Sequence, residues 1–267
     1  MYGIFLDGES KTGKTTVGSA IEADLAKDYQ VYKAVAGSFY RRLTVLAVEA
    51  HGEYTHDDLS WLESAMKDAI ASREAYSEDR SWDAINSKEI DELVSVAGQL
   101  PIVQAAGKEW WPIMADTALA QGADVLVVDG RNPRAKLADW RASHDMPIAL
   151  DLCVYCDAEV AADRYVRSQG VLEPSDAQLT DAKDSIIKRR ELDRNRPVAA
   201  YEEPPNQIDF DSGFSDAGEV VYQAFQADVA EPPQVIRFDT THSPLEVTQV
   251  TAGALSRAAL QYLQQGK

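Results

Sequence analysis

The sequence predicts an α/β protein with a parallel, doubly wound sheet of about five strands. Two observations lead to this prediction. Short apolar runs of the kind found in buried strands recur along the chain, and a helical pattern follows most of them. The chain has 267 residues, of which 45% are apolar, so it is long enough to bury a full core. We therefore expect one domain that carries insertions.

Five segments are predicted to form the strands. The first is an apolar run that ends in Asp7-Gly8, and the last follows a proline pair. Glycine or proline flanks most of these runs, as expected where a buried strand gives way to a loop. The five predicted strands are residues 2–7, 30–35, 124–129, 147–154 and 234–239.

Helical periodicity fills the segments between these strands. A helix follows Lys14, because Val17, Ile21 and Leu25 recur every four residues. Residues 38–121 are helical in pattern and form an insertion on the sheet, in which Thr55 to Asp58 is predicted to cap one helix. Further helices are expected over 157–168, over 175–195 and from residue 244 onward.

The first loop carries a phosphate-binding motif. Residues 8–15 match G-x-x-x-x-G-K-[ST] in full, after a predicted strand and before a predicted helix. The backbone N–H groups and the helix N-terminus would hold the phosphates of ATP. We expect Lys14 to reach the β- and γ-phosphates, and Thr15 to hold Mg²⁺ beside Asp129. The predicted ATP-binding residues are Gly8, Ser10, Lys11, Thr12, Gly13, Lys14, Thr15 and Thr16.

The charge of the chain restricts its partners. The formal net charge of −18 argues against a nucleic-acid partner, since binding a polynucleotide backbone requires a basic stripe. Cations gather instead in residues 188–196, where Arg189, Asp193 and Arg196 share one helix face. The alternative for this segment is a solvated helix face with internal ion pairs.

Other features of the sequence bear on location and packing. We expect a cytoplasmic protein that has no leader and no membrane span, because no apolar run approaches 18 residues. Cys153 and Cys156 are then expected to stay reduced. Trp110 and Trp111 are predicted to pack in a core, with stacking on a base as the alternative.

Several separate motifs together resemble the bacterial cytidylate kinases, which belong to the nucleoside monophosphate kinases and the P-loop NTPase superfamily. The most specific motif is Arg189-x-x-x-Asp193-x-x-Arg196, followed by Pro-Val-Ala. The others are residues 8–16, 37–41, 90–101, 129–131, 158–160 and 238–241.

This resemblance implies a single P-loop kinase domain. Its parts would be a core over 1–37, 122–163 and 234–267, a helical acceptor-binding insertion over 38–121, a short lid with an arginine helix over 164–202, and an extra insertion over 203–233. The implied activity is ATP- and Mg²⁺-dependent phosphorylation of a nucleoside monophosphate, CMP or dCMP-like, by direct in-line transfer. The partners would be small nucleotides, and the protein a monomer or small homo-oligomer.

The resemblance also implies roles for individual residues. Lys14, Arg131, Arg189 and Arg196 would be catalytic, and Arg41 would join the three arginines around the acceptor phosphate and the transferring group. Asp193 would meet the sugar hydroxyl. Tyr40 and Ser95 would lie beside the acceptor and its base, and Arg164 on the ATP side.

The sequence departs from the family pattern in several places, and two of the changes, Gln104 and Asn132, fall where the family reads the base. Gln104 and Asn132 replace an arginine and an aspartate, Val35-Ala36 replaces Asp-Thr or Asp-Ser, and Arg190 replaces an aspartate near the lid. We therefore hypothesise a shifted or relaxed base preference. The alternatives are a kinase for a modified nucleotide or another phosphorylated acceptor, a polynucleotide kinase, and a nucleotide-binding protein without turnover.

Overall fold

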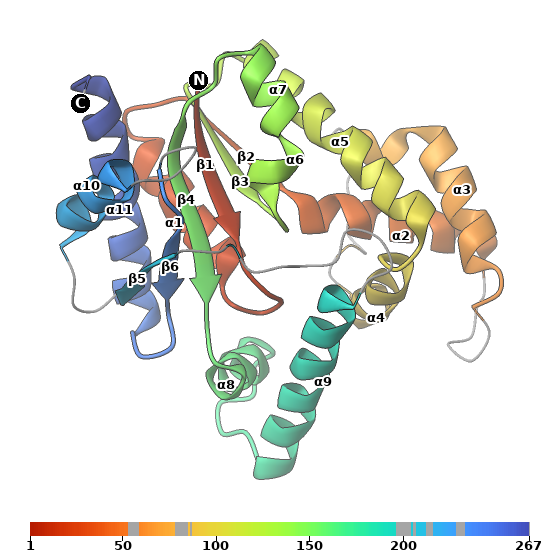
Figure 1. Cartoon of the computed structure of the whole chain (residues 1–267). Helices are drawn as coiled ribbons and strands as arrows, with labels where there is room; N and C mark the ends of the chain where they lie inside the picture. Colours follow the sequence, from red (N-terminus) through yellow and green to blue (C-terminus); the bar gives the residue numbers. More distant parts are fainter. Residues whose placement is uncertain are drawn as a thin grey trace.

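The computed structural model describes residues 1–52, 59–77, 85, 87–195, 204, 207–211, 216–227 and 233–266. Its centre is a parallel sheet of six strands in the order β2-β3-β1-β4-β6-β5 (Figure 1). The α/β doubly wound prediction is confirmed. The strands are β1 (Tyr2–Asp7), β2 (Val31–Val35), β3 (Val125–Asp129), β4 (Ile148–Tyr155), β5 (Ile208–Asp211) and β6 (Ile236–Asp239).

Both faces of the sheet are covered because its central strands are apolar on both sides. On β1, Ile4 and Leu6 face a layer formed by α1 (Lys14–Leu25), α10 (Ala217–Gln226) and α11 (Leu245–Gln264). Phe5, between them, faces the opposite layer of α2 (Ala36–His51), α5 (Pro101–Ala120) and α7 (Ala138–Ser143). This alternation places the two cores on opposite sides of one sheet.

The predicted helical insertion packs at one side of the sheet (Figure 1). There α2 and α5 are joined by α3 (Leu62–Ser72), a 3-10 turn over Glu74–Tyr76 and α4 (Lys88–Ala97). Trp110 and Trp111 are both buried, and the Trp110 ring stacks on Phe39 at 5.2 Å between centroids. The prediction that the two tryptophans pack in a core is confirmed, whereas the predicted cap at residues 55–58 lies outside the described part.

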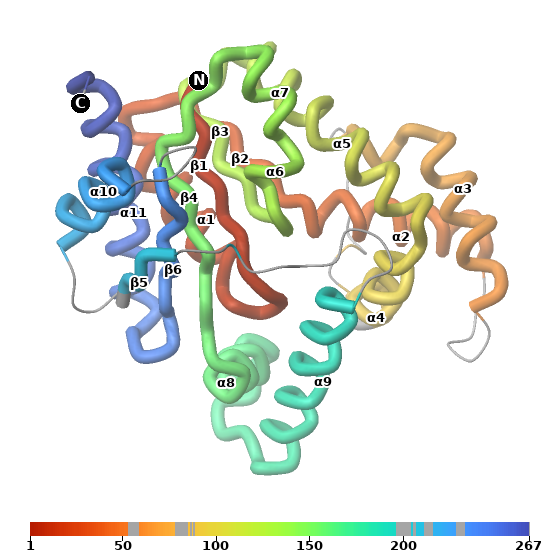
Figure 2. The backbone as a smooth tube through the Cα atoms, in the orientation of Figure 1, coloured from red at the N-terminus to blue at the C-terminus, as the bar shows by residue number. Residues whose placement is uncertain are grey.

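A helical hairpin extends beyond the carboxyl ends of the strands (Figure 2). It consists of α8 (Ala158–Ser168) and α9 (Asp176–Arg194), which pack on each other through a small apolar cluster. A capping box begins α9, with the Ser175 side chain accepting from the backbone N–H of Gln178 and the Gln178 side chain accepting from the backbone N–H of Ser175. The hairpin covers part of residues 164–202, which are expected to form the lid and the arginine helix.

The sequence predicts about five strands, whereas the sheet has six. Within residues 203–233, expected to be a separate insertion, β5 pairs in parallel with β6 and α10 packs on α11. The Phe210 and Phe238 rings stack across this pair, 5.8 Å apart. The sequence Ile-Asp-Phe-Asp gives β5 one apolar face only, so it lacks the continuous apolar run that revealed the other strands.

Two further findings concern the residues that the structure describes. No helix among them is long and apolar enough to cross a membrane. Cys153 and Cys156 are both buried and form no disulfide.

Candidate active site

A cavity of about 720 Å³ lies at the carboxyl edge of the sheet. Its walls come from the phosphate loop, from the helical region at α2, α4 and α5, from the α8–α9 hairpin and from the loop after β6. The carboxyl edge of a doubly wound sheet is the usual place for a ligand, because the loops after parallel strands converge there.

The phosphate loop is held in place by its neighbours. The Asp7 Oδ1 accepts a hydrogen bond from the Gly8 N–H at 2.6 Å, and the Arg131 Nη1 donates to the Gly8 carbonyl. Gly8 has a φ of +126°, and a Cβ there would lie 2.2 Å from the Val154 carbonyl oxygen. Only glycine fits where the loop crosses β4 so closely.

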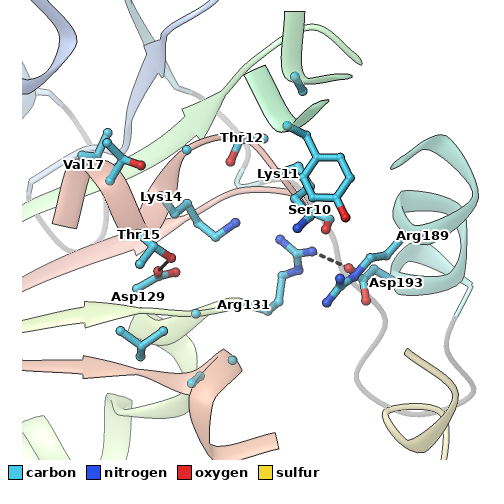
Figure 3. A pocket seen from close by; sticks show the side chains of 18 of the residues that line it. Ser10, Lys11, Thr12, Lys14, Thr15, Val17, Asp129, Arg131, Arg189 and Asp193 are labelled. Atoms are coloured by element: carbon cyan, nitrogen blue, oxygen red, sulfur yellow. Dashed lines mark hydrogen bonds and ion pairs between the residues drawn. The ribbon is translucent and has the colours of Figure 1, made fainter. Parts of the chain in front are cut away.

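Two oxygen groups meet beside the loop. The Thr15 hydroxyl at the start of α1 donates to the Asp129 Oδ2 at the end of β3, at 2.7 Å (Figure 3). A hydroxyl and a carboxylate at this spacing suit Mg²⁺, which is usually held by few protein oxygens together with waters and phosphates. The donor set therefore fits the predicted ion.

Lys14 lies close to both Arg131 and Asp129. Its ammonium donates to the Glu9 carbonyl. Although the side chain lines the cavity, the protein around its tip removes most water, and this burial lowers the pKa of Lys14 to about 8. The charge of Arg131 acts in the same direction, whereas Asp129 opposes it.

A second group of cations lies across the cavity from the Thr15–Asp129 pair. Arg41 from α2, Arg131 after β3 and Arg189 from α9 all line the cavity, together with Asp193. The Arg131 Nη2 donates to the Asp193 Oδ2 (Figure 3). Burial lowers the pKa of Arg189, and the nearby charge of Arg41 adds to this effect. Such a cluster is a suitable environment for phosphate oxygens.

The wall nearest the helical region has a different character. Gln104 is buried, and its Nε2 donates to the Gly98 carbonyl at 2.7 Å. Ser95 lines the same cavity and donates within α4 to the Asp91 carbonyl at 3.3 Å. Tyr40 lies against α5, where a Cβ on Gly107 would lie 2.2 Å from the Tyr40 hydroxyl. Glycine at position 107 therefore allows the tyrosine to reach this wall.

The opposite end of the cavity is formed by α8 and the loop after β6. The Arg164 Nη2 donates to the carbonyls of Thr240 at 2.6 Å and Ser243 at 3.0 Å. These bonds tie α8 to the loop and leave the flat guanidinium in the wall. Leu245 and Thr248, at the start of α11, line the same end.

Most of the predicted site residues are brought together here. The cavity is lined by Ser10, Lys11, Thr12, Gly13, Lys14, Thr15, Thr16, Tyr40, Arg41, Ser95, Gln104, Asp129, Arg131, Arg164, Arg189 and Asp193. Gly8 shapes the loop without lining the cavity. Asn132 does not line it either; this residue has a φ of +49° at the start of α6 (Pro133–Lys136). Arg196 lies outside the described residues.

Sequence reasoning missed two acidic residues near the cavity. Asp91 of α4 accepts from the Arg41 Nη2 at 2.7 Å. Glu9 of the phosphate loop is 5% exposed; its Oε2 lies 3.4 Å from the Arg190 Nε and its Oε1 lies 2.6 Å from the Arg194 Nη2. None of the three arginines is near its acidic partner in sequence, so no local pattern signals these pairs. Arg190 itself also donates to the carbonyls of Ser10 and Cys156.

The sequence is similar to those of known cytidylate kinases. The sequence profile of the cytidylate kinase family matches residues 4–228. Cytidylate kinases of Neisseria meningitidis serogroups C and B are each 30% identical over 214 residues, covering 78% of this chain and 88% of theirs. A crystal structure from Chloroflexus aurantiacus, provisionally named as a kinase, has a TM-score of 0.42 and 14% identity, with coverage of 100% of this chain and 97% of its own.

Proposed function

The chain belongs to the cytidylate kinase family, and on that premise we propose that it transfers the γ-phosphoryl group of ATP to the phosphate of a nucleoside monophosphate. The products would be ADP and the nucleoside diphosphate, and the preferred acceptors would carry a pyrimidine base, as CMP and dCMP do. An oxygen of the acceptor phosphate attacks the γ-phosphorus in line with the leaving ADP oxygen, so the protein needs no nucleophile of its own.

One observation carries this proposal. A single cavity joins the phosphate loop with its Thr15–Asp129 pair to a compartment that contains Arg41, Arg131 and Arg189. A donor nucleotide on the loop and an acceptor phosphate among the arginines would therefore share one space from which water can be excluded. This is the arrangement that direct transfer between two bound nucleotides requires.

Each cation has a role in this proposal. Lys14 would contact the β- and γ-phosphates, while Arg131 and Arg189 would neutralise charge on the equatorial oxygens of the transferring group. Arg41 would hold the acceptor phosphate, and Arg196 is proposed to complete the set. Mg²⁺ held near Thr15 and Asp129 would supply further neutralisation of the phosphates. Asp193 would accept a hydrogen bond from the sugar hydroxyl of the acceptor.

The wall at Gln104 supports a relaxed preference among pyrimidines. One N–H of this amide is used by the Gly98 carbonyl, which leaves one N–H and the amide oxygen for a base. A neutral donor and acceptor can pair with N3 and N4 of cytosine or with N3 and O4 of uracil, whereas an arginine offers donors only. We therefore expect UMP to be accepted alongside CMP.

The test is an assay of ADP release with Mg·ATP against CMP, dCMP, UMP, dUMP, TMP, AMP and GMP, with the diphosphate product identified. Turnover with CMP and UMP at similar kcat/KM supports the proposal. Activity confined to a purine nucleotide contradicts the assignment of the wall at Gln104 to a pyrimidine base. A lack of activity with every nucleotide tested contradicts the proposal that the acceptor is a nucleotide. A titration with a fluorescent oligonucleotide separates the polynucleotide alternative, which requires submicromolar binding at moderate salt.

A further inference from the structure

The phosphate loop contains a second lysine, Lys11, whose backbone belongs to the predicted ATP-binding motif but whose side chain has no role in the proposed transfer. Lys11 lines the cavity, and its side chain is 30% exposed. Its ammonium lies 4.2 Å from the centroid of the Tyr165 ring of α8, a distance suited to a cation–π contact. In Figure 3, Lys11 lies on the side of Arg189 and Asp193, whereas Lys14 starts beside Thr15 and its ammonium points toward Arg131. The two lysine side chains of this loop therefore lie in different parts of the cavity.

The backbone at Lys11 is unusual. Its φ is +59°, in the left-handed region that glycine adopts freely and other residues rarely do. A non-glycine residue there costs about 1 kcal/mol or more, and such strain persists where the surrounding structure holds it, often at a functional site. The strained backbone directs a long cationic side chain to one particular place.

That place holds three cations around one carboxylate. The Asp91 Oδ1 accepts from the Arg41 Nε at 3.1 Å and from the Arg41 Nη2 at 2.7 Å, and the Asp91 Oδ2 lies 3.8 Å from the Lys11 Nζ. The charge of Arg189 also acts on Asp91. Burial alone would raise the pKa of Asp91, but Arg41 and Lys11 hold that pKa below its ordinary value. The carboxylate therefore remains an anion among cations that come from the phosphate loop, α2 and α9.

Two of these cations, Arg41 and Arg189, are among those assigned above to phosphate groups. Three cations near one another repel unless an anion lies between them. The Asp91 carboxylate supplies one negative charge and two acceptor oxygens, and a nucleotide phosphate supplies up to two charges and three oxygens. The same cations can therefore hold either anion, and a phosphate holds them with more charge.

We propose that the Lys11 ammonium is a further ligand of the acceptor phosphate, and that the Asp91 carboxylate occupies the position of this phosphate and exchanges with it. The inference rests on the proposed function, since it places the acceptor phosphate at Arg41. The exchange is ionic: Arg41 and Lys11 release the carboxylate and contact the phosphate oxygens, and no covalent bond changes. Asp91 then acts as a competitor of the acceptor and Lys11 as its ligand.

A purely structural role for the pair makes a different prediction. If Lys11 and Asp91 only fasten α4 to the phosphate loop, removing either partner weakens acceptor binding in the same way. In the exchange mechanism the two substitutions act in opposite directions. Lys11→Met removes a ligand of the phosphate, whereas Asp91→Asn removes a competing anion and keeps a side chain of the same size.

The experiment measures acceptor binding directly, with the donor side filled. Protein saturated with Mg·ADP is titrated calorimetrically with CMP and, separately, with inorganic phosphate. Lys11→Met should weaken both by about tenfold or more, as expected for the loss of one charged hydrogen bond, while ADP affinity changes less than twofold. Lys11→Arg should recover most of the loss. Asp91→Asn should bind both probes severalfold more tightly.

A matched control is Lys67→Met, which makes the same charge change at an exposed position of α3 and should leave both affinities unaltered. Weaker binding by Asp91→Asn, unchanged binding by Lys11→Met, or an equal loss of ADP affinity would each overturn the proposal. So would a failure of the unmodified protein to bind inorganic phosphate. Because binding is measured without turnover, a protein that binds phosphate as described but releases no ADP would refute the proposed function and leave the Lys11 site intact.

Discussion

Glu9 and Arg190 form an ion pair between the phosphate loop and α9, with the Glu9 Oε2 lying 3.4 Å from the Arg190 Nε. Both side chains are almost fully enclosed, at 6% and 10% exposure. Arg190 also donates to the carbonyl of Ser10 within the loop and to that of Cys156, directly after β4. One residue earlier, Arg189 lines the cavity. The pair therefore fixes the helix that presents Arg189.

We predict that Glu9→Gln destabilises the protein and lowers kcat. Removing one partner leaves Arg190 buried with less compensation, at a cost of about 3 kcal/mol in the free energy of unfolding. Urea unfolding and the ADP-release assay check this. In a double-mutant cycle, Arg190→Met combined with Glu9→Gln should be less destabilised than the sum of the single changes. Additive effects would show that the two side chains do not interact.

We predict that Arg189→Ala lowers kcat by about a hundredfold or more and leaves the fold intact. In the proposed transfer the guanidinium would act on charge that develops on the phosphoryl group, and the loss of one such donor is known to reduce rates by that order. Steady-state kinetics with a check by circular dichroism measure this. Lys183→Ala on the same helix, whose ammonium bonds the exposed Glu159, is the matched control and should keep its rate. Near-normal kcat in a folded Arg189→Ala variant would contradict the assignment.

We predict that Gln104→Arg narrows the acceptor range toward CMP. The new guanidinium would offer donors only, which suit N3 and O2 of cytosine and conflict with the N3–H of uracil. The ratio of kcat/KM for CMP over UMP should rise by about tenfold or more. Asn132→Asp should alter that ratio less, because Asn132 does not line the cavity. If both variants keep the acceptor ranking of the unmodified protein, the altered-preference hypothesis is wrong.

We predict that ADP binding takes up a proton above pH 8. Burial lowers the pKa of Lys14 to about 8, so at pH 9 most of the protein carries a neutral amine there. Bound phosphates favour the ammonium and restore the proton, whereas at pH 6.5 the ammonium is already present and no uptake is expected. Calorimetry in two buffers with different ionisation enthalpies measures the number of protons. Lys11→Met should keep this uptake, which would tie the proton to Lys14.

We predict that deprotonation of Asp151 lowers the free energy of unfolding as the pH rises from about 4 to above 6. Burial raises the pKa of this carboxyl to about 6, although the charge of Arg134, 3.1 Å away, opposes the rise. Between its unfolded and folded pKa values, only the folded protein keeps the proton, so stability falls with rising pH by up to about 3 kcal/mol. Urea unfolding of the unmodified protein relative to Asp151→Asn should show that slope. A pH-independent difference would contradict it.

The sequence was sufficient to predict those features that depend on residues close together in the chain. Five strands were visible as apolar runs, and the loop from Gly8 to Thr15 was identified by its glycines and its lysine. β5 was missed because its alternating residues place only one face on a core. A local sequence pattern does not indicate which other strand a segment will pair with.

The site shows the same division. Arg41, Arg131 and Arg189 could be assembled only through the family resemblance, since they come from α2, the loop after β3 and α9. Asp91 lies 80 positions from Lys11, and Arg190 lies 181 positions from Glu9. Carboxylates at such separations pair with a loop only after the helices have packed. The sequence reveals which side chains are charged, and the fold decides which charges meet.

The continuity of the cavity has a consequence for inhibition. The proposed donor end at Arg164 and the proposed acceptor end at Gln104 belong to one cavity. A molecule that joins adenosine to a pyrimidine nucleoside through a polyphosphate chain would fill both ends at once. Binding of its first half would place the second at a high effective concentration, and the loss of free tumbling would be incurred once instead of twice. Affinity would then depend sharply on the number of phosphates in the bridge, which would serve as a ruler for the distance between the two nucleosides.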